Sequence, residues 1–190
     1  MNNISNIRES LRVVLIGNNV FLQSGIEAVL GRKVCTDISE EEVMAGSGLL
    51  LLAPEGTMIQ KRIKMLSLIN SMNTVSGWRG INLVDRRDRK SVRFAHLTGL
   101  PVLDLNLGKD ELLQHIMSCM RKKTEIRSDS IGRLTTRQWE AISVSLDENH
   151  VKRASRKSTF YNHRMSALRR LRLLNMHELR LLVSDCNFWT

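Results

Sequence analysis

Residues 150–172 read HVKRASRKSTFYNHRMSALRRLR and contain eight lysine or arginine residues without one aspartate or glutamate. A block of this kind is usually a surface for a partner. In its second half the apolar residues have helical spacing, because at about 100° per residue Phe160, Ala167 and Leu171 fall on one stripe. Leu168 lies beside them. The pattern therefore predicts a helix whose apolar stripe is core.

The opposite side of this helix carries mostly hydrogen-bonding side chains edged by guanidinium groups. These residues are Ser158, Tyr161, Asn162, Met165, Ser166 and Arg169. A helix that enters the major groove of DNA needs this combination, because cations hold phosphates and neutral polar groups read base edges. The sequence predicts a DNA-contacting helix, and the alternative is a basic helix that faces only solvent.

The length and charge of the chain limit its possible folds and partners. With 190 residues, of which 42% are hydrophobic, the chain can bury one good core and a second, smaller one, so we expect two domains. A net charge of +10 and an isoelectric point near 10.2 favour a polyanionic partner, either nucleic acid or an anionic membrane surface. Nucleic acid is favoured, because the longest apolar run, residues 49–53, is far below the roughly 18 residues of a spanning helix.

Several classes of site lack their sequence signals. The first residues, MNNISNIRES, lead into no signal-like apolar segment, so we expect a cytosolic protein. Cys35, Cys119 and Cys186 are odd in number and widely spaced, which predicts neither a disulfide framework nor a zinc site. The histidines have no metal-binding spacing, and no nucleotide-binding glycine motif is present. We expect no metal, no cofactor, no small-molecule ligand and no enzymatic activity.

In the first two thirds of the chain, apolar runs of strand length alternate with helical patterns. The run LRVVLIG, residues 11–17, suits a strand buried on both faces. Further strands are expected at residues 33–38, 49–53, 81–84 and 100–107. Helices are expected after Asn18 or Asn19, with Phe21, Ile26, Val29 and Leu30 as the apolar side, and over residues 57–72, 86–96 and 109–122. Residues 39–42 are expected to form an acidic turn. This alternation predicts a doubly wound parallel sheet of the flavodoxin-like α/β class.

Past a polar stretch near residues 122–131, two capping patterns mark helix starts. Thr135 with Gln138 forms a capping box, and Leu134 with Trp139 forms its hydrophobic staple, so a helix should begin at Thr136. Asn175 with Glu178, and Leu174 with Leu179, repeat the device and start a last helix. We therefore divide the chain into an α/β domain at 1–123, a linker at 124–132 and a small all-α domain at 133–190.

Two separated motifs in the small domain resemble the LuxR/FixJ-type helix-turn-helix family, also called NarL-type. They are LTTRQWEAI at residues 134–142 and STFYNHRMSALRRL at residues 158–171. The first opens with the Leu-Thr-x-Arg pattern of the family, and the second carries its Thr, His and Leu positions along the recognition helix. The resemblance implies that Tyr161, Asn162 and Met165 face base edges, whereas Thr159 and His163 lie near phosphates.

The residues expected to contact DNA, from the pattern and the resemblance together, form one set. They are Lys157, Ser158, Thr159, Tyr161, Asn162, His163, Met165, Ser166, Arg169 and Arg170. The interval between the two motifs is shorter than is typical of the family, and residues 147–158, DENHVKRASRKS, lack its usual Lys-Glu-Ile-Ala helix. Ser155 and Ser158 are therefore alternative caps for the recognition helix.

The first domain resembles a response-regulator receiver that has lost its phosphorylation chemistry. LIGNNVFLQSGIEAVL, residues 15–30, is similar to the first strand and helix of receivers, but Asn18 and Asn19 replace the acidic pair that holds the metal. An amide coordinates Mg²⁺ much more weakly than a carboxylate. Ala53 stands where the phosphate-accepting aspartate would lie, and no lysine follows residues 101–107 in the expected place. The resemblance implies a pseudo-receiver used for contacts, as in accessory LuxR-type regulators of enteric bacteria.

Together these observations favour a cytoplasmic, nucleoid-associated transcription regulator that binds double-stranded promoter DNA. The pseudo-receiver would dimerise with itself or with another LuxR-type response regulator. The alternative is a co-regulator or anti-activator that binds proteins and does not recognise DNA alone, which the short interval before Ser158 favours. A second basic run, Arg86, Arg87, Arg89 and Lys90, is either a solvated helix face or a surface that docks an acidic partner.

Overall fold

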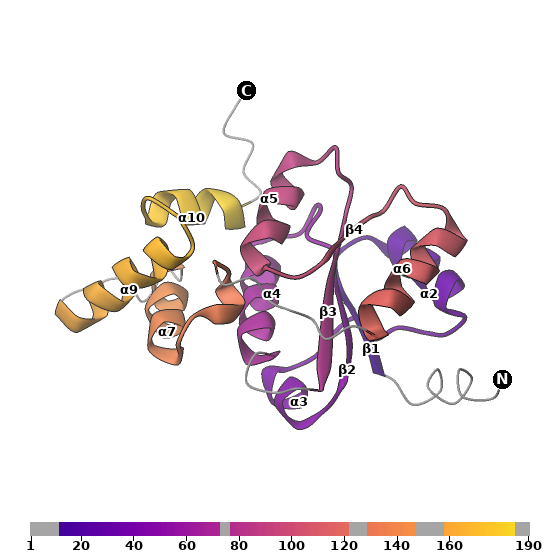
Figure 1. Ribbon diagram of the computed structural model, residues 1–190, viewed down its shortest axis with the longest axis horizontal. Coiled ribbons are helices and arrows are strands. Elements are labelled where there is room, and N and C mark those ends of the chain that lie inside the picture. Colours follow the sequence, from indigo (N-terminus) through magenta and orange to yellow (C-terminus); the bar gives the residue numbers. More distant parts are fainter. Residues whose placement is uncertain (1–11, 73–76, 122–128, 147–157, 185–190) are drawn as a thin grey trace.

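The computed structural model describes residues 12–72, 77–121, 129–146 and 158–184. Their centre is a parallel sheet of four strands in the spatial order of their labels. The strands are β1 (Arg12–Ile16), β2 (Gly48–Leu52), β3 (Trp78–Val84) and β4 (Val102–Asp104). Helices cover both of its faces (Figure 1), which confirms the predicted α/β class.

The segment that follows the first helix completes the flavodoxin-like order. Cys35 pairs with Val14 in parallel on the free side of β1. The Leu15 amide donates to the Cys35 carbonyl at 2.7 Å, and the Cys35 amide donates to the Val13 carbonyl at 3.0 Å. If this segment is counted as the second strand along the chain, β2, β3 and β4 become the third, fourth and fifth. The spatial order is then 2-1-3-4-5, as in flavodoxin-like sheets. The expected strand at 33–38 is wrong in extent, because it is reduced to this one bridge.

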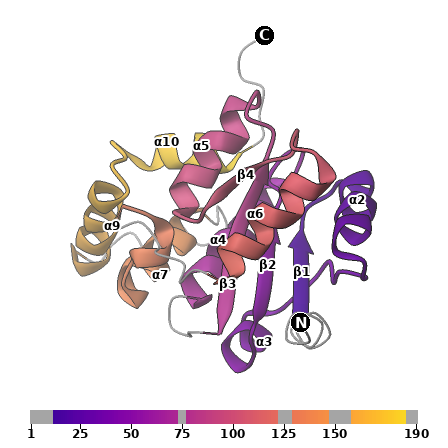
Figure 2. The same ribbon diagram turned by 45° about the vertical axis from the view of Figure 1, so that its right-hand side comes forward.

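Alternate side chains of each strand enter two different cores. Val14, Ile16, Leu50 and Leu52 point toward α3 (Glu40–Ala45), α4 (Ile59–Met72) and α5 (Arg89–Thr98). Val13, Leu15, Leu49 and Leu51 point toward α2 (Val20–Leu30) and α6 (Lys109–Arg121). Figures 1 and 2 show these two helix layers on opposite sides of the sheet. Burial on both faces explains why the strands read as continuous apolar runs.

Two expectations about the first helices are wrong. In α2, Asn19 is the cap, since its side chain accepts from the Leu22 amide at 3.1 Å, but Phe21 is 89% exposed and does not belong to the apolar side. Residues 39–42 do not form a turn. Ser39 and Glu42 make a reciprocal capping box that starts α3, so the serine followed three residues later by glutamate was a helix signal.

The remaining described residues form η1 (Ile131–Arg133), α7 (Thr136–Leu146), α9 (Ser158–Arg170) and α10 (Met176–Val183). The capping box at the start of α7 is confirmed: the Thr135 amide donates to Gln138 Oε1 at 3.0 Å, and the Gln138 amide donates to Thr135 Oγ1 at 3.3 Å. Asn175 caps α10 as expected. The staple between Leu174 and Leu179 is wrong, because Leu174 is 84% exposed.

We call η1, α7, α9 and α10 the helical part, and the sheet with its covering helices the α/β part. The helical part packs directly on the α/β part. One hydrophobic cluster runs from the sheet through α4 and α5 into the core of α7, α9 and α10. At the junction, Ile131 is completely buried and η1 contacts α4 and α5. Ser130 is buried as well, so the described end of the expected linker is a packed segment. Among the described residues, no helix is long and apolar enough to cross a membrane.

Candidate nucleic-acid interface

Helix α9 has the register that its sequence predicts. Ala167, Leu168 and Leu171 are at most 6% exposed and belong to the shared hydrophobic cluster. On the opposite side, Tyr161 and Asn162 are exposed, and Figure 1 shows α9 at the edge of the molecule away from the sheet. The prediction that Phe160 is core needs correction, because Phe160 is only half-buried and does not belong to this cluster. The polar face of α9 is therefore presented to the outside by a buried apolar stripe.

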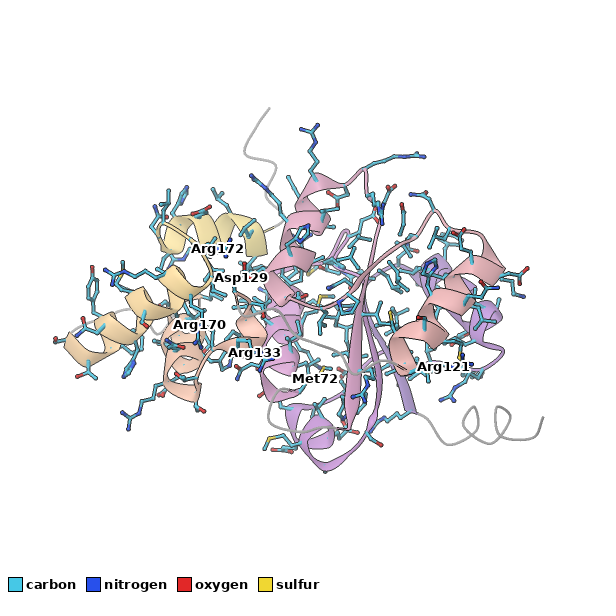
Figure 3. All side chains as sticks on the ribbon, viewed as in Figure 1. Met72, Arg121, Asp129, Arg133, Arg170 and Arg172 are labelled. Atoms are coloured by element: carbon cyan, nitrogen blue, oxygen red, sulfur yellow. The ribbon has the colours of Figure 1, made fainter. Side chains whose placement is uncertain are left out.

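Two hydrogen bonds hold α9 in place, one to the start of α7 and one to η1. Gln138, whose side chain also caps α7, donates from Nε2 to Ser166 Oγ at 2.9 Å. Arg170 donates from Nη1 to the Arg133 carbonyl at 2.5 Å, as the positions of both residues in Figure 3 suggest. Ser166 and Arg170 thus have positioning roles in addition to the DNA contacts predicted for them. Arg170 keeps further donors, because a guanidinium group has five N–H bonds.

The C-terminal end of α9 is closed by a Schellman motif. The Leu173 amide donates to the Leu168 carbonyl at 2.9 Å, and the Arg172 amide donates to the Arg169 carbonyl at 3.1 Å. Arg172 adopts a left-handed conformation with φ of 57°, where glycine is the usual residue. Its Nε lies 3.4 Å from Asp129 Oδ2 (Figure 3). The basic end of α9 is thereby tied to the junction segment.

The structure separates the predicted DNA-contacting residues into three groups. Ser158, Thr159, Tyr161, Asn162, Ser166, Arg169 and Arg170 are exposed. His163 and Met165 are half-buried, and Met165 packs against the hydrophobic cluster, so the expectation that it faces base edges needs correction. Lys157 and the alternative cap Ser155 lie outside the described residues. Ser158 is the first described residue of α9, and the choice of cap stays a prediction.

Arg164 belongs to this face but was missed in the set predicted from the sequence. Its guanidinium carbon lies over the Tyr161 ring, 5.3 Å from the ring centroid. Residues three apart on a helix are neighbours, so this spacing was the available signal. The contact holds an aromatic ring and a permanent cation together next to Asn162. No aspartate or glutamate occurs in the sequence of α9 to neutralise this surface.

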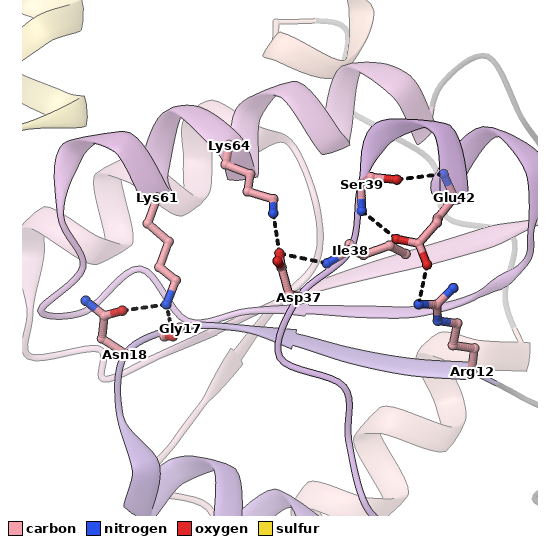
Figure 4. A network of polar contacts seen from close by, with 9 residues as sticks. All are labelled: Arg12, Gly17, Asn18, Asp37, Ile38, Ser39, Glu42, Lys61 and Lys64. Atoms are coloured by element: carbon pink, nitrogen blue, oxygen red, sulfur yellow. Dashed lines mark hydrogen bonds and ion pairs between the residues drawn. The ribbon is translucent and has the colours of Figure 1, made fainter.

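The region that would be the phosphorylation site of a receiver holds a lysine. Lys61 of α4 donates from Nζ to the Gly17 carbonyl and to Asn18 Oδ1, both at 2.6 Å (Figure 4). The ammonium group lies beside Asn18, at the carboxyl end of β1, where an acidic pair would bind the metal. A second cation there is disfavoured by charge repulsion. Ala53 is 3% exposed, and its side chain offers only a methyl group.

Comparison with known proteins gave matches only among solved structures, since no family model and no curated protein sequence matches this chain. Full-length FixJ from B. japonicum has 13% sequence identity and a TM-score of 0.43, with 91% of this chain and 95% of that chain covered. The response regulator RcsB from Salmonella typhimurium has 12% identity and a TM-score of 0.42, covering 90% and 96%. The response regulator StyR has 14% identity and a TM-score of 0.35, covering 90% and 97%. The fold described above rests on the strand order and contacts of this chain alone.

Polar contacts around α3 and α4 continue from Lys61 along the sheet edge. Lys64 pairs with Asp37, and the hydrogen bond from Lys64 is the main cause that lowers the pKa of the Asp37 carboxyl (Figure 4). Arg12 pairs with Glu42 at 2.8 Å, and the Ser39 amide is the main cause that lowers the pKa of Glu42. These contacts fasten α3 between β1 and α4.

A buried arginine next to Lys61 connects the loop after β2 to α5. Arg62 is 1% exposed and donates to the Pro54 carbonyl from Nε at 3.1 Å and from Nη2 at 2.8 Å. Its Nε also lies 3.1 Å from Thr57 Oγ1, and its guanidinium group lies over the Phe94 ring at 5.5 Å. Separating a buried charge from its hydrogen-bond partners is strongly unfavourable. The loop at residues 53–57 is therefore held in one conformation.

Proposed function

We propose that this protein is a transcription regulator that binds double-stranded promoter DNA through the exposed face of α9. The observation that carries the proposal is that Tyr161 and Asn162 are exposed on the same helix whose opposite side buries Ala167 and Leu168. In a major groove, the Asn162 amide would read a base edge, since asparagine can bond adenine in a bidentate manner. Arg164, Arg169 and Arg170 would hold phosphates.

We further propose that the α/β part is a pseudo-receiver that acts without phosphorylation. Lys61 already supplies a cation at the carboxyl end of β1, and Ala53 has no group that could accept a phosphoryl. The absence of enzymatic activity stays a prediction. Incubation of the protein with a small phosphodonor and Mg²⁺ should give no acyl-phosphate, and stable labelling would contradict this part of the proposal.

The pseudo-receiver would serve as a contact surface for a second copy or for another LuxR-type response regulator in the bacterial cytoplasm. A protein-binding co-regulator without autonomous DNA recognition is the second candidate. It is favoured by three large apolar side chains near the carboxyl end of the sheet, Val20, Phe21 and Met58, which are 71%, 89% and 71% exposed. Exposed apolar patches of this kind are common at protein interfaces.

Two substitutions in α9 test the proposed function. Asn162→Ala should cost about 1–3 kcal/mol at the cognate site and little on random duplexes, because it removes a base contact. Arg169→Ala should weaken binding to both duplexes alike, because it removes a phosphate contact. Genome-wide footprinting supplies the cognate site, and fluorescence anisotropy measures the affinities. Equal losses on both duplexes for both variants would refute these roles, and a protein that binds no duplex without a partner would favour the co-regulator.

A further inference from the structure

Helix α5 presents a second basic surface that lies outside the helix-turn-helix region. Its buried side is formed by Ser91, Phe94, Ala95, Leu97 and Thr98. Its exposed side carries Arg89, Lys90 and Arg93, and Arg86 and Arg87 are exposed in the turn before it. We call these five cations the α5 basic surface. The sequence alone left open whether this run is a solvated face or a docking surface.

The carboxylates near this surface are already engaged, and one of them contacts a cation of the surface itself, Arg86. Asp88 caps α5 by accepting from the Lys90 amide at 3.0 Å. Asp104 lies 3.6 Å from Arg86, and its Oδ1 accepts from Asn106. Among the residues that the structure describes, no carboxylate pairs with Arg89 or Arg93. These two guanidinium groups are available to an anion from outside the described chain.

The placement of these cations opposes the stability of α5 itself. Arg89 and Arg93 are four residues apart on one helix face, a spacing at which like charges repel. Arg89 and Lys90 also stand in the first turn, where the helix dipole favours negative charge. A bound anion would relieve both effects. The arrangement therefore suits a surface that receives phosphates better than one that only solvates the protein.

The α5 basic surface is held at a fixed position relative to α9. α10 contacts α5, and the buried contacts of η1 with α4 and α5 join the two parts of the molecule. Figures 1 and 2 both show α10 between α9 and α5. The one helix between them, α10, has eight residues and is about 12 Å long.

We propose that the α5 basic surface contacts the phosphate backbone of the DNA that flanks the α9 site. This inference rests on the proposed function, because it requires a duplex to be bound at α9. The α5 contacts would carry no sequence information. They would add affinity and fix the direction in which the α/β part lies along the duplex.

The test compares two double variants of the full chain with equal loss of charge. Arg89→Ala with Arg93→Ala removes two cations from the α5 basic surface. The control, Lys109→Ala with Arg121→Ala, removes two exposed cations from α6 on the opposite side of the sheet, where Figure 3 labels Arg121. Circular dichroism confirms that both variants fold. Affinity for a labelled 40-bp random-sequence duplex is then measured between 50 and 200 mM salt.

Affinity falls as salt rises, and in the α5 variant this dependence should be weaker. The magnitude of the slope of log affinity against log salt should decrease by about 1.8, which corresponds to the loss of two phosphate contacts. The variant's loss of affinity relative to wild type should thus be about twelvefold larger at 50 mM than at 200 mM salt. The α6 control should retain the wild-type slope.

Equal slopes for the wild type and the α5 variant, with a reduced slope for Arg169→Ala, would overturn this inference and leave the proposed function standing. An unchanged slope for Arg169→Ala, with a reduced slope for the α5 variant, would support α5 as a DNA contact and contradict the role proposed for α9. Absence of any duplex binding by the wild type would overturn both proposals.

Discussion

Ile131→Ala should destabilise both parts of the molecule at once. Ile131 is completely buried where η1 meets α4 and α5, inside the cluster that joins the two cores. The substitution removes three carbon atoms, worth about 2.4 kcal/mol at about 0.8 kcal/mol per methylene, and leaves a cavity that adds to this loss. We expect a total loss of about 3–4 kcal/mol, which is a large fraction of the roughly 5–15 kcal/mol of a typical domain.

The two parts carry different tryptophan probes for this experiment. Trp78 is buried in the α/β part, and Trp139 packs in the helical part. Urea unfolding is followed in variants in which Trp78 or Trp139 is the single tryptophan, with Trp189 replaced in both. Because the cluster is continuous, both probes should report one transition, and Ile131→Ala should shift both midpoints together. Leu174→Ala, at an 84% exposed position, is the matched control and should change stability by less than about 0.5 kcal/mol.

Two separate transitions, with the Trp78 transition unchanged by Ile131→Ala, would refute this reasoning. The helical part would then be an independent domain that only rests on α4 and α5. The fixed spacing between α9 and the α5 basic surface would lose its structural basis as well.

Two further predictions concern single side chains. Arg172→Gly should stabilise the protein by up to about 1 kcal/mol in urea unfolding, because glycine adopts the left-handed conformation without strain and the ion pair with Asp129 contributes little from an Arg172 side chain that is 80% exposed. A loss of stability would mean that this ion pair outweighs the strain. For Asp37, the Lys64 hydrogen bond lowers the folded-state pKa, so its contribution is present above the unfolded pKa near 3.9 and is lost as pH falls through the folded value. Asp37→Asn should therefore reduce stability at pH 6 by less than about 1 kcal/mol, since Asp37 is largely exposed, and the reduction should become smaller toward pH 2 as the carboxyl takes up a proton. An equal loss at both pH values would contradict the electrostatic explanation.

The sequence predicted what depends on neighbours along the chain. The apolar runs gave the sheet, and the alternation of strand and helix gave its class. The Thr135 and Gln138 pair predicted the exact first residue of α7, because a capping box is formed by two residues that are three apart. The same rule applied to Ser39 and Glu42 would have found α3, where the acidic composition was instead interpreted as a turn.

The features that the sequence did not predict depend on contacts between distant residues. Lys61 meets Gly17 across 44 positions, and no local pattern indicates that its ammonium group would lie at the carboxyl end of β1. Ile131 stands in a polar stretch that suggested a linker, yet it is buried because α4 and α5 provide an apolar surface for it. Met165 occupies a polar stripe on α9, but its flexible side chain packs against the hydrophobic cluster.

If the α/β part is the pseudo-receiver proposed above, Lys61 and Arg62 explain how its fold is kept without phosphorylation chemistry. Adjacent residues at the start of α4 send one cation to Gly17 and Asn18 and the other to Pro54 and Thr57. The first holds the loop after β1 and the second holds the loop after β2, which are the loops that a metal and a phosphoryl group would organise in a phosphorylatable receiver. Because Arg62 also lies over Phe94 of α5, the loop after β2 is linked to the helix that α10 contacts. Because these side-chain contacts already hold the loops after β1 and β2, no ligand is needed to fix them. The α/β part can then present α5 and the helical part in one constant arrangement.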